Sequence, residues 1–584
     1  MAAKKESAPE VSLESNDPNV PKPRLVKLIV KNFRCIGPAS VEIELDDIVI
    51  LVGANNVGKS SILRAYKLAM SQGSVAGRLA LDDFPNGQID PANLPQIEVQ
   101  TVVYDDTVGK RWVDESSGER IVRECWTWSQ DGADPQRQGW DANDKGWADK
   151  VPWGAPGYAN SRRPEPYFID AFDNPDSQAK EIVKLLRQEL DSRLKAYKAD
   201  GDSESEYSKL LKQLGKIQKK IVDEAQEQIQ DVNVKLTELV QLVFPDHRVD
   251  FDARPEENLD DNVKFFKSDS QLLMGPEKGH MSTIQKQGSG ARRTLLWTAI
   301  KFLAENTRKV KSASSERPHL LLMDEPEICL HPNAIREACK ALYSLPSTGK
   351  WQVMATTHSP IFIDFSQNNT TIVRVEKTKS GDIEGTTVFR PSSMSLSDDD
   401  KENLKLLNIC DPYVAEFFFG GKIVIVEGDT EYTAFKYIIS QNPELYRDVH
   451  IIRARGKYTI VSLVKVLNHF NARYSILHDM DNPLTKKNTA NSAWAANGQI
   501  ISEASPSREN DDVRVYASLP NFEEAYFGLT SSDEKPYKAL KAIMEDKTKY
   551  EKIGMLLDVL VGTSNKLPAN CVKWFEISEL QELV

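Results

Sequence analysis

Apolar and polar residues alternate near the start of the chain, and a fully apolar run follows them. The alternation in Arg24–Phe33 and in the next segment, SVEIEL, predicts two β-strands. The run at Ile48–Val52 is apolar at every position, as expected of a central strand covered on both faces. Residues 59–70 are predicted to form a helix. The pattern thus predicts strands that lead, through a short loop, into a helix.

A different period marks the middle of the chain. Residues 177–243 are rich in Lys, Glu, Gln and Leu and contain no Pro. From Leu214 to Val243 the apolar residues recur at steps of three or four, which predicts an amphipathic helix. A polar stretch at 199–206 divides the segment, so we expect two long helices in an antiparallel hairpin. Two interpretations stay open: packing within the subunit, or a helical dimerisation arm.

Strand-like runs return later in the chain. HLLLM at His319–Met323 and WQVMAT at Trp351–Thr356 are apolar and short. The polar, acidic stretch at 391–405 indicates a domain boundary. Beyond it, the segments KIVIVEGDTEYTAFKYII, VHIIRARG, ARYSILHDMDN and VRVYASLPNFEEA alternate strand-like with helix-like patterns. This alternation predicts a mostly parallel sheet covered by helices.

Length and composition bound the class of protein. The 584 residues suggest three or four structural units at roughly 150 residues each. The formal net charge of −12 excludes a binder of nucleic acid that works through charge alone. The six cysteines form no CxxC pair, which excludes a zinc ribbon and fits a reducing cytoplasm. Residues 1–23 are expected to be a disordered leader without a secretory signal, and no apolar run approaches a membrane span.

The sequence GANNVGKS at Gly53–Ser60 matches the phosphate-binding pattern G-x-x-x-x-G-K-[ST]. It lies between the predicted central strand and the predicted helix, which is the context that the pattern requires. Backbone N–H groups of such a loop surround the phosphates, its lysine reaches the β- and γ-phosphates, and its hydroxyl holds Mg²⁺. ATP is therefore an expected ligand. The predicted nucleotide-binding residues of the loop are Gly53, Asn55, Asn56, Gly58, Lys59, Ser60 and Ser61.

Three later motifs complete the predicted nucleotide site. Asp324 and Glu325 follow the run HLLLM, and they suit a Mg²⁺ contact and the activation of the attacking water. QGSGARRTLL precedes them, while CLHP and TTHSP follow. This order resembles the head of ABC-type ATPases, although the signature departs from the common LSGGQ spelling. The resemblance implies that Ser289 and Gly290 of one subunit cap the nucleotide of another, and that His358 senses its γ-phosphate.

A second group of acids follows the strands of the last part of the chain. Residues i and i+2 at a strand end point the same way, and the ends of parallel strands meet at one edge of the sheet. Carboxylates without paired histidines favour Mg²⁺ or Mn²⁺ over Zn²⁺. The predicted metal ligands are Glu427, Glu431, Asp479, Asp481 and Glu523, with Glu524 as the alternate to the last.

IVIVEGDTEY followed by the DMD of SILHDMDN resembles the Toprim domain of primases, topoisomerases and certain nucleases. An ABC-type head joined to a Toprim domain resembles the overcoming lysogenization defect (OLD) family, which includes the nuclease subunit of Gabija phage defence and effectors of some retrons. The resemblance covers nearly the whole chain after Arg24. It implies an α/β fold: an ABC-type ATPase domain at 24–395 with a helical dimerisation insertion at 177–243, a linker at 396–414, and a Toprim nuclease domain at 415–584.

The resemblance implies ATP-regulated, metal-dependent DNA cleavage in antiphage defence, with two cations at the phosphodiester. It also implies a lysine late in the Toprim domain, which we place at Lys566, ahead of an expected helix, with Lys535 as the runner-up. Expected partners are DNA, further copies of the chain in a dimer or a dimer of dimers, and a helicase or a retron reverse transcriptase with its DNA. Two alternatives stay open: a clamp-like DNA-repair ATPase related to SMC and RecF proteins whose Toprim domain does not cut, and an interaction protein that uses ATP to hold a partner enzyme.

Local groups of cationic side chains must bind the DNA, because the chain as a whole is acidic. Arg453, Arg455 and Lys457 in RARGKY, with Lys486 and Lys487, are candidates for phosphate contacts, the alternative being solvated loop charges. An aromatic segment precedes the hairpin, and it is expected to pack in a core, with a stacking platform for single strands as the alternative. Its tryptophans are Trp126, Trp128, Trp140, Trp147 and Trp153.

Overall fold

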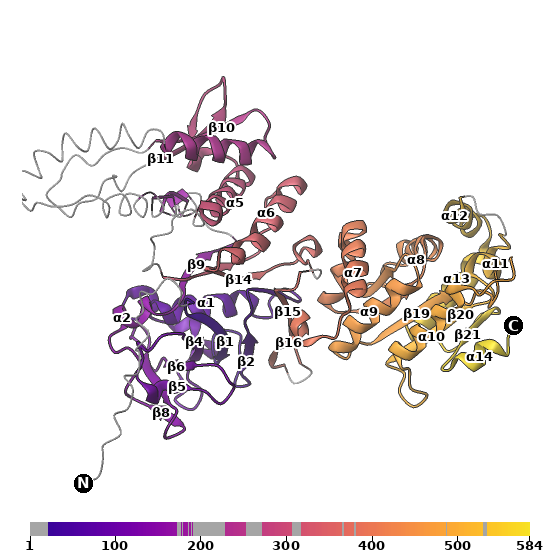
Figure 1. The fold of residues 1–584 in the computed structure, drawn as a ribbon, viewed down its shortest axis with the longest axis horizontal. Coiled ribbons are helices and arrows are strands. Elements are labelled where there is room, and N and C mark those ends of the chain that lie inside the picture. Colours follow the sequence, from indigo (N-terminus) through magenta and orange to yellow (C-terminus); the bar gives the residue numbers. More distant parts are fainter. Residues whose placement is uncertain are drawn as a thin grey trace, which may run out of the picture. The chain divides into compact units, whose positions relative to one another are not determined.

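The structure is a computed structural model of the chain (Figure 1). It describes residues 21–171, part of 177–190, 228–252, 271–306, 317–364, 367–378, 381–485, 487–529 and 534–584. The leader up to residue 20, the predicted break at 199–206 and Lys486 lie outside the described residues. The chain divides into two compact units. The first comprises Met1–Val49, Asn56–Thr357 and Lys377–Glu384, and the second Ile50–Asn55, His358–Glu376 and Gly385–Val584.

An antiparallel sheet of seven strands opens the first unit. Its order is β2-β1-β4-β6-β7-β8, with β5 paired to β6. Buried and more exposed residues alternate along the first two strands, which confirms the strands predicted from the apolar–polar alternation. The strands are β1 (Arg24–Lys31), β2 (Val41–Glu44), β4 (Gln96–Val102), β5 (Val113–Asp114), β6 (Ile121–Thr127), β7 (Gln136–Asp141) and β8 (Gly146–Ala148).

A six-stranded sheet contains the predicted central strand β3 (Ile48–Val52). Its order is β16-β15-β3-β14-β13-β9, and β13 pairs in parallel with both of its neighbours. All residues of β3 and β14 are buried, which explains their continuous apolar sequences. The other strands are β9 (Glu165–Ile169), β13 (His319–Met323), β14 (Trp351–Thr356), β15 (Thr370–Lys377) and β16 (Ile383–Phe389). The helices of the first unit include α1 (Lys59–Met70), α2 (Pro156–Ser161), α5 (Ser289–Asn306) and α6 (Pro332–Ser344).

The tryptophans ahead of the insertion pack mainly against the protein. Trp126 and Trp128 are fully buried, and their indole N–H groups donate to Gln72 and to the carbonyl of Gly77. Trp140 and Trp147 meet edge to face with ring centroids 5.4 Å apart. These contacts support core packing rather than a stacking platform for bases.

The described part of the predicted helical insertion includes a helix at 228–241. The Thr237 hydroxyl lies against β10 (His247–Asp252), where it accepts from the backbone N–H of Val249 at 3.1 Å. This strand forms a small sheet with β11 (Gln271–Pro276) and β12 (Ser282–Thr283). The apolar stripe of this described helix is therefore covered within its own subunit, while most of the insertion lies outside the described residues and its predicted role in dimerisation stays a prediction. The buried residues of the helix are Ile229, Val232, Leu236 and Val240.

A five-stranded sheet forms the centre of the second unit. Its order is β18-β17-β19-β20-β21; the first four strands are parallel and the last is antiparallel, as predicted for a mostly parallel sheet. The strands are β17 (Lys422–Val426), β18 (Val449–Arg453), β19 (Tyr474–Asp479), β20 (Val513–Ser518) and β21 (Cys571–Lys573). The helices are α7 (Asp398–Cys410), α8 (Asp429–Gln441), α9 (Lys457–His469), α10 (Ser492–Ala504), α11 (Phe522–Phe527), α12 (Lys535–Glu545), α13 (Lys547–Leu560) and α14 (Ile577–Gln581).

The segment predicted as a linker contains the helix α7. Ser397 caps it in a capping box, in which its hydroxyl accepts from the N–H of Asp400 and the carboxylate of Asp400 accepts from the N–H of Ser397. Asp400 also pairs with Lys465 at 2.7 Å and accepts from the hydroxyl of Ser462 at 2.9 Å, both on α9. The predicted linker is thus tied to the second unit. Of the helices in the described part of the chain, none combines the length and the apolar character needed to cross a bilayer.

Candidate nucleotide and metal sites

Glycines shape the phosphate loop where its backbone takes positive φ. Gly53 has φ of +138°, and a Cβ there would lie 2.1 Å from the carbonyl oxygen of Val375. Gly58 has φ of +92° and caps α1, so that the helix begins at Lys59 as predicted. Side chains are strained or excluded at both positions, and glycine therefore lets the loop take this path.

Ser60 and Asp324, the two predicted Mg²⁺ contacts, lie against each other. The hydroxyl of Ser60 donates to Oδ1 of Asp324 at 3.0 Å. The same carboxylate oxygen accepts from the hydroxyl of Thr356 at 2.6 Å, and Thr356 Oγ1 accepts from the N–H of Glu325 at 3.0 Å. β13 and β14 thus bring the acidic strand end beside the start of α1. The sequence did not single out Thr356.

The electrostatics around the loop lysine suit phosphate binding. Lys59 is 6% exposed; burial lowers its pKa, and Glu325, Asp324 and Glu327 act in the opposite direction. Burial, followed by the neighbouring charge of Asp324, raises the pKa of Glu325. A carboxylate of raised pKa is a better proton acceptor from an attacking water. The oxygen donors of Ser60 and Asp324 fit a Mg²⁺ ion.

The signature residues Ser289 and Gly290 begin α5. Ser289 is exposed, whereas a Cβ on Gly290 would lie 2.7 Å from the carbonyl oxygen of Cys329, in the predicted contact loop CLHP. The signature and this loop therefore pack together within one subunit and leave Ser289 accessible. His358 and Asn55 belong to the second compact unit and adjoin the first along the chain. Ser61 is buried beside Cys35, with Oγ and Sγ 3.8 Å apart.

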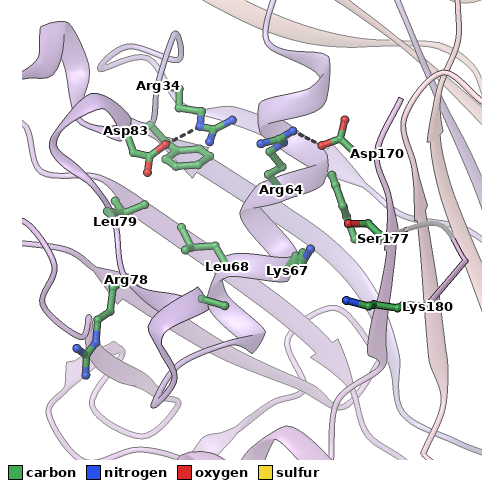
Figure 2. A pocket seen from close by; sticks show the side chains of 13 residues that line it. Arg34, Arg64, Lys67, Leu68, Arg78, Leu79, Asp83, Asp170, Ser177 and Lys180 are labelled. Atoms are coloured by element: carbon green, nitrogen blue, oxygen red, sulfur yellow. Dashed lines mark hydrogen bonds and ion pairs between the residues drawn. The ribbon is translucent and has the colours of Figure 1, made fainter. Parts of the chain in front are cut away.

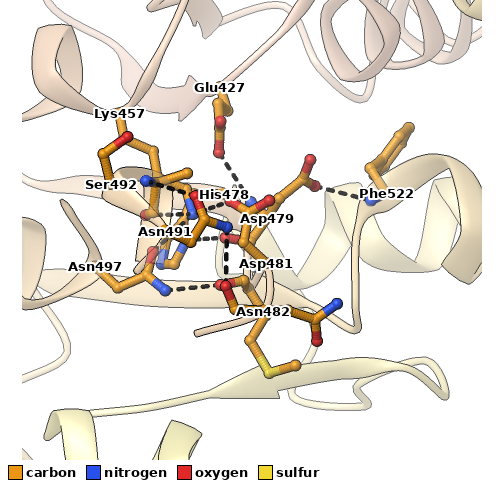
Figure 3. Close-up of polar contacts among 12 residues, drawn as sticks. Glu427, Lys457, His478, Asp479, Asp481, Asn482, Asn491, Ser492, Asn497 and Phe522 are labelled. Carbon is orange, nitrogen blue, oxygen red and sulfur yellow. Dashed lines mark hydrogen bonds and ion pairs between the residues drawn. The ribbon is translucent and has the colours of Figure 1, made fainter. Parts of the chain in front are cut away.

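In the second unit, Glu427 directly follows β17 and Asp479 ends β19, and Figure 3 shows the contact between them; Glu431 lies in the first turn of α8 and Glu523 in α11. The backbone N–H of Asp479 donates to Oε2 of Glu427 at 3.0 Å, and Oδ1 of Asp479 accepts from the N–H of Phe522 at 2.8 Å. Glu523 is 7% exposed and accepts from the hydroxyl of Thr430 at 2.7 Å. Its neighbour Glu524 is exposed and accepts from the side chain of Asn521. Of the two alternates, Glu523 is the one that faces inward.

Burial shifts the titration of these acids upward. Burial is the main cause that raises the pKa of Glu431 to about 8, and the nearby carboxylates of Glu427 and Glu523 raise it further. The pKa of Asp479 is raised by burial and then by Glu431 and Glu427, and burial also raises the pKa of Glu427. The carboxylates of Glu427, Glu431 and Asp479 therefore lie close together in a low-dielectric environment, where their ionised forms repel one another.

This donor set fits a divalent cation. Bound cations reverse the cost of crowding carboxylates, and hard oxygen donors suit Mg²⁺ or Mn²⁺. Glu427, Glu431, Asp479 and Glu523 are the side chains that would hold it. Among the described residues, no group of three or more Asp, Glu, His or Cys side chains is arranged to hold a metal ion. The fold nevertheless brings several acids close together at this position.

A buried lysine, Lys457, binds the carboxylate of Asp481. Lys457 Nζ donates to Oδ2 of Asp481 at 2.5 Å, to Oδ1 of Asn497 at 2.8 Å and to the carbonyl of Ala493 at 3.1 Å. Its side chain is 3% exposed, so it is a structural cation, and the predicted phosphate contact from Lys457 does not fit its position. Asn497, which also donates to the carbonyl of Met480 at 2.7 Å, was not found from the sequence.

The remaining cations of RARGKY differ in their surroundings. Arg453 pairs with Asp429 at 2.7 Å and lies 3.7 Å from Asp411. Arg455 and Lys487 are exposed. The last two are the positions among the described candidates that are open to a DNA phosphate.

The two candidate lysines occupy different surroundings. Lys535 Nζ lies 3.3 Å from Oε2 of Glu523, whereas Lys566 is exposed and forms no ion pair with any described residue. The helix expected after Lys566 is absent: 564–568 is coil and β21 follows. Pro568 explains this difference, because proline lacks an N–H and disfavours the helical conformation of the residue before it. Geometry therefore favours the runner-up as the cation of the acidic site.

Two family models match the chain. The model described as "AAA ATPase domain" matches residues 24–105 and 156–363, and the "Overcoming lysogenization defect protein-like, TOPRIM domain" matches residues 418–481. The Old nuclease of Escherichia phage P2 is 24% identical over 479 residues, which are 78% of this chain and 77% of the relative. The OLD nuclease of Thermus scotoductus is 22% identical over 536 residues, 88% of this chain and 94% of the relative.

Solved Smc head domains are similar at a lower level. The Smc head domain with an extended coiled coil from Pyrococcus furiosus has 14% identity and a TM-score of 0.37, covering 66% of this chain and 99% of its own. The SMC head domain from Thermotoga maritima has 14% identity and a TM-score of 0.31, covering 63% and 99%. The predicted fold class, an α/β chain with an ATPase domain followed by a Toprim domain, is confirmed by the two family matches and the sheets.

Proposed function

The chain belongs to the overcoming lysogenization defect family of ATPase–Toprim nucleases, and we propose that it is an ATP-regulated, divalent-metal-dependent DNA endonuclease of antiphage defence. One observation carries the metal dependence: Glu427 accepts from the N–H of Asp479, and burial followed by neighbouring carboxylates raises the pKa of Asp479 and of Glu431. A cation relieves this repulsion. The alternative of a clamp that does not cut does not suit a member of a nuclease family.

In the proposed nuclease reaction, each residue has a separate task. Glu427, Glu431, Asp479 and Glu523 would hold the cation, which would supply activation of a water and stabilisation of the leaving oxygen. The N–H groups of Asp479 and Phe522 fix two of the contacts that orient these carboxylates. Lys535, beside Glu523, supplies positive charge for the phosphoryl oxygens as the scissile bond breaks. Lys457 neutralises Asp481 and positions the loop that follows β19.

ATP use is proposed to need two copies of the chain. Lys59 and Ser60 bind the phosphates and the accompanying Mg²⁺, and Glu325 accepts the proton of the attacking water. Ser289 begins α5 on the surface, where it is accessible to a nucleotide held by a second subunit. His358 is proposed to sense the γ-phosphate. We place this assembly in the cytoplasm, with a helicase or a retron reverse transcriptase as candidate partners.

Plasmid nicking by the purified chain tests the proposal. Supercoiled DNA is incubated with Mg²⁺, Mn²⁺ or EDTA, each with and without ATP. Nicked circles should form with a divalent cation and not in EDTA, and ATP should change the rate. Glu325→Gln, which keeps phosphate binding but loses the proton acceptor, should retain ATP without turning it over. An intact plasmid under all metal conditions would count against the endonuclease assignment.

A further inference from the structure

A cavity of about 470 Å³ opens in the first unit, in the region of α1 (Figure 2). Its walls come from the residues after β1, from α1, from the segment after α1 and from the chain that follows β9. No residue predicted for the phosphate loop lines it, nor does Asp324 or Glu325. The cavity is therefore separate from the residues assigned to ATP.

Positive charge dominates this cavity. Two acids line it, Asp83 and Asp170, and each is already ion-paired, the first with Arg34 at 2.8 Å and the second with Arg64. The five cations that line it are Arg34, Arg64, Lys67, Arg78 and Lys180. Lys67 and Lys180 are exposed and form no ion pair with any described residue. Arg78 pairs with Asp134 at 3.2 Å, so the positive charge that is not paired with a described acid comes from Lys67 and Lys180.

Aromatic rings contact three of these cations. The ammonium of Lys67 lies 4.6 Å from the ring centroid of Phe168, and the guanidinium of Arg64 lies 5.6 Å from the same ring. Phe33 is 2% exposed, with the guanidinium of Arg34 5.4 Å from its ring centroid. Both rings are therefore engaged by the protein's own cations. A ligand in this cavity would therefore contact cationic side chains rather than an open aromatic ring on which a base could stack.

We propose that this cavity binds the sugar–phosphate backbone of a single DNA strand, at an end or in an unpaired segment. Its volume lies within the range of about 300–1,000 Å³ that encloses a small-molecule-sized group, so it admits a nucleotide of one strand but not a double helix. Cationic grooves of this kind follow single strands through their phosphates without regard to sequence. The inference rests on the proposed function, because it gives the ATPase unit its own contact with the substrate DNA.

The test measures binding to a labelled single-stranded oligonucleotide by fluorescence anisotropy, in EDTA, with the full chain carrying Asp479→Ala. The pocket variant is Lys67→Gln with Lys180→Gln. Its matched control is Lys145→Gln with Lys150→Gln, two exposed lysines of the same unit that do not line the cavity. Each lost phosphate contact lowers the slope of log K against log salt by about 0.7, so the pocket variant should lose about 1.4 and the control nothing.

The remaining arms separate the possible sources of phosphate. ATP affinity of the pocket variant should equal that of the control, and inorganic phosphate at millimolar concentration should weaken binding of the strand. An unchanged salt slope in the pocket variant overturns the proposal. So does a variant that loses ATP affinity but binds the single strand as the control does. An equal loss of slope for a blunt duplex also overturns it. Plasmid nicking is measured separately on the native chain. If the native chain nicks DNA but the pocket variant keeps its salt slope, only the cavity proposal is rejected. If the pocket variant loses slope but the native chain does not nick DNA, only the nuclease assignment is rejected.

Discussion

The phosphate loop and the loop after β18 both deliver a lysine to the first residue of a helix. In each, a glycine of positive φ comes just before it: Gly58 at +92° before Lys59, and Gly456 at +132° before Lys457. Both lysines are nearly buried, at 6% and 4% exposure. A strand followed by a glycine, a lysine and a helix therefore occurs in both compact units.

The surroundings of the two lysines decide their uses. Lys457 donates to Asp481, Asn497 and Ala493, which all belong to its own unit, and these acceptors satisfy the three donors of an ammonium. Lys59 instead starts the helix that follows the phosphate-loop motif, and the N-terminus of such a helix attracts anions. A buried lysine can thus either complete a protein interior or face an anionic ligand. In the sequence, the longer loop, its first glycine and the serine after the lysine distinguish the phosphate loop from RARGKY.

The largest effect is expected from Lys59→Ala. Loss of a cation placed at the phosphates should reduce ATP turnover by about 10²–10³-fold, as for the removal of one donor that stabilises transition-state charge. Steady-state release of inorganic phosphate measures it. Lys457→Ala is the matched variant and should retain ATP turnover if the comparison holds; equal loss in both variants would show that the two lysines serve one site.

Asp479→Ala should separate the two phosphate chemistries. It removes the carboxylate at the end of β19, so nicking should fall by about 10²-fold or more, while ATP hydrolysis by Asp324 and Glu325 persists. Nicking and phosphate release are assayed on the same preparation, with circular dichroism to verify folding. Loss of both activities in a folded protein would point to one shared site or to obligate coupling.

The next comparison is Lys535→Ala against Lys566→Ala. Because the first lies 3.3 Å from Glu523 and the second is exposed, we expect about a 10-fold slower rate of nicking for the first and a native rate for the second. The rates are compared at saturating metal. A native rate for Lys535→Ala with a slow Lys566→Ala would restore the assignment made from the sequence.

Lys457→Met tests the structural side of the comparison. It leaves Asp481 and Asn497 without their shared donor, which should lower the free energy of unfolding of the second unit by about 2 kcal/mol. Urea unfolding followed by circular dichroism measures the change. The conservative variant Lys457→Arg should recover part of the loss, whereas a Lys457→Met chain as stable as the native one would rule out a structural role.

The smallest effect concerns pH. An acid whose folded pKa is raised binds its proton more tightly in the folded state, so stability is lost as pH rises from the unfolded value toward the folded one. For Glu431 this window runs from its usual value near 4.5 up to about 8. Metal-free protein should therefore unfold at lower urea concentration at pH 8 than at pH 5.5. Glu431→Gln should flatten this dependence, and so should Mg²⁺; an unchanged slope in the variant would argue that another group titrates.

Local patterns predicted the elements but not the pairings. The bounds of α1 follow from the loop motif, and β3 and β19 follow from continuous apolar runs, because each signal lies within a few residues. The acid group of the second unit was also predictable, since parallel strand ends meet at one edge. Contacts that join distant residues were not: Lys457 meets Asp481 and Asn497 only after α9 and α10 pack together.

The insertion shows the same limit. Its periodic apolar stripe predicts a helix but does not predict which part of the protein packs against the stripe. In the described helix at 228–241 the cover comes from the same subunit, through contacts such as Thr237 with Val249. Likewise, the position of Lys566 in the sequence suggested a site lysine, yet the ion pair of Glu523 is made by Lys535.

The capped helix α7 has a practical consequence for dissecting the chain. A fragment that begins at residue 415 would remove Leu404 and Leu407, which are 1% and 2% exposed, together with the partner of Lys465. Truncation there would uncover apolar surface on α9 and leave a cation without its counter-ion. A nuclease fragment that retains its native surface must begin ahead of Ser397, and proteases that attack unstructured joints should leave this stretch uncut.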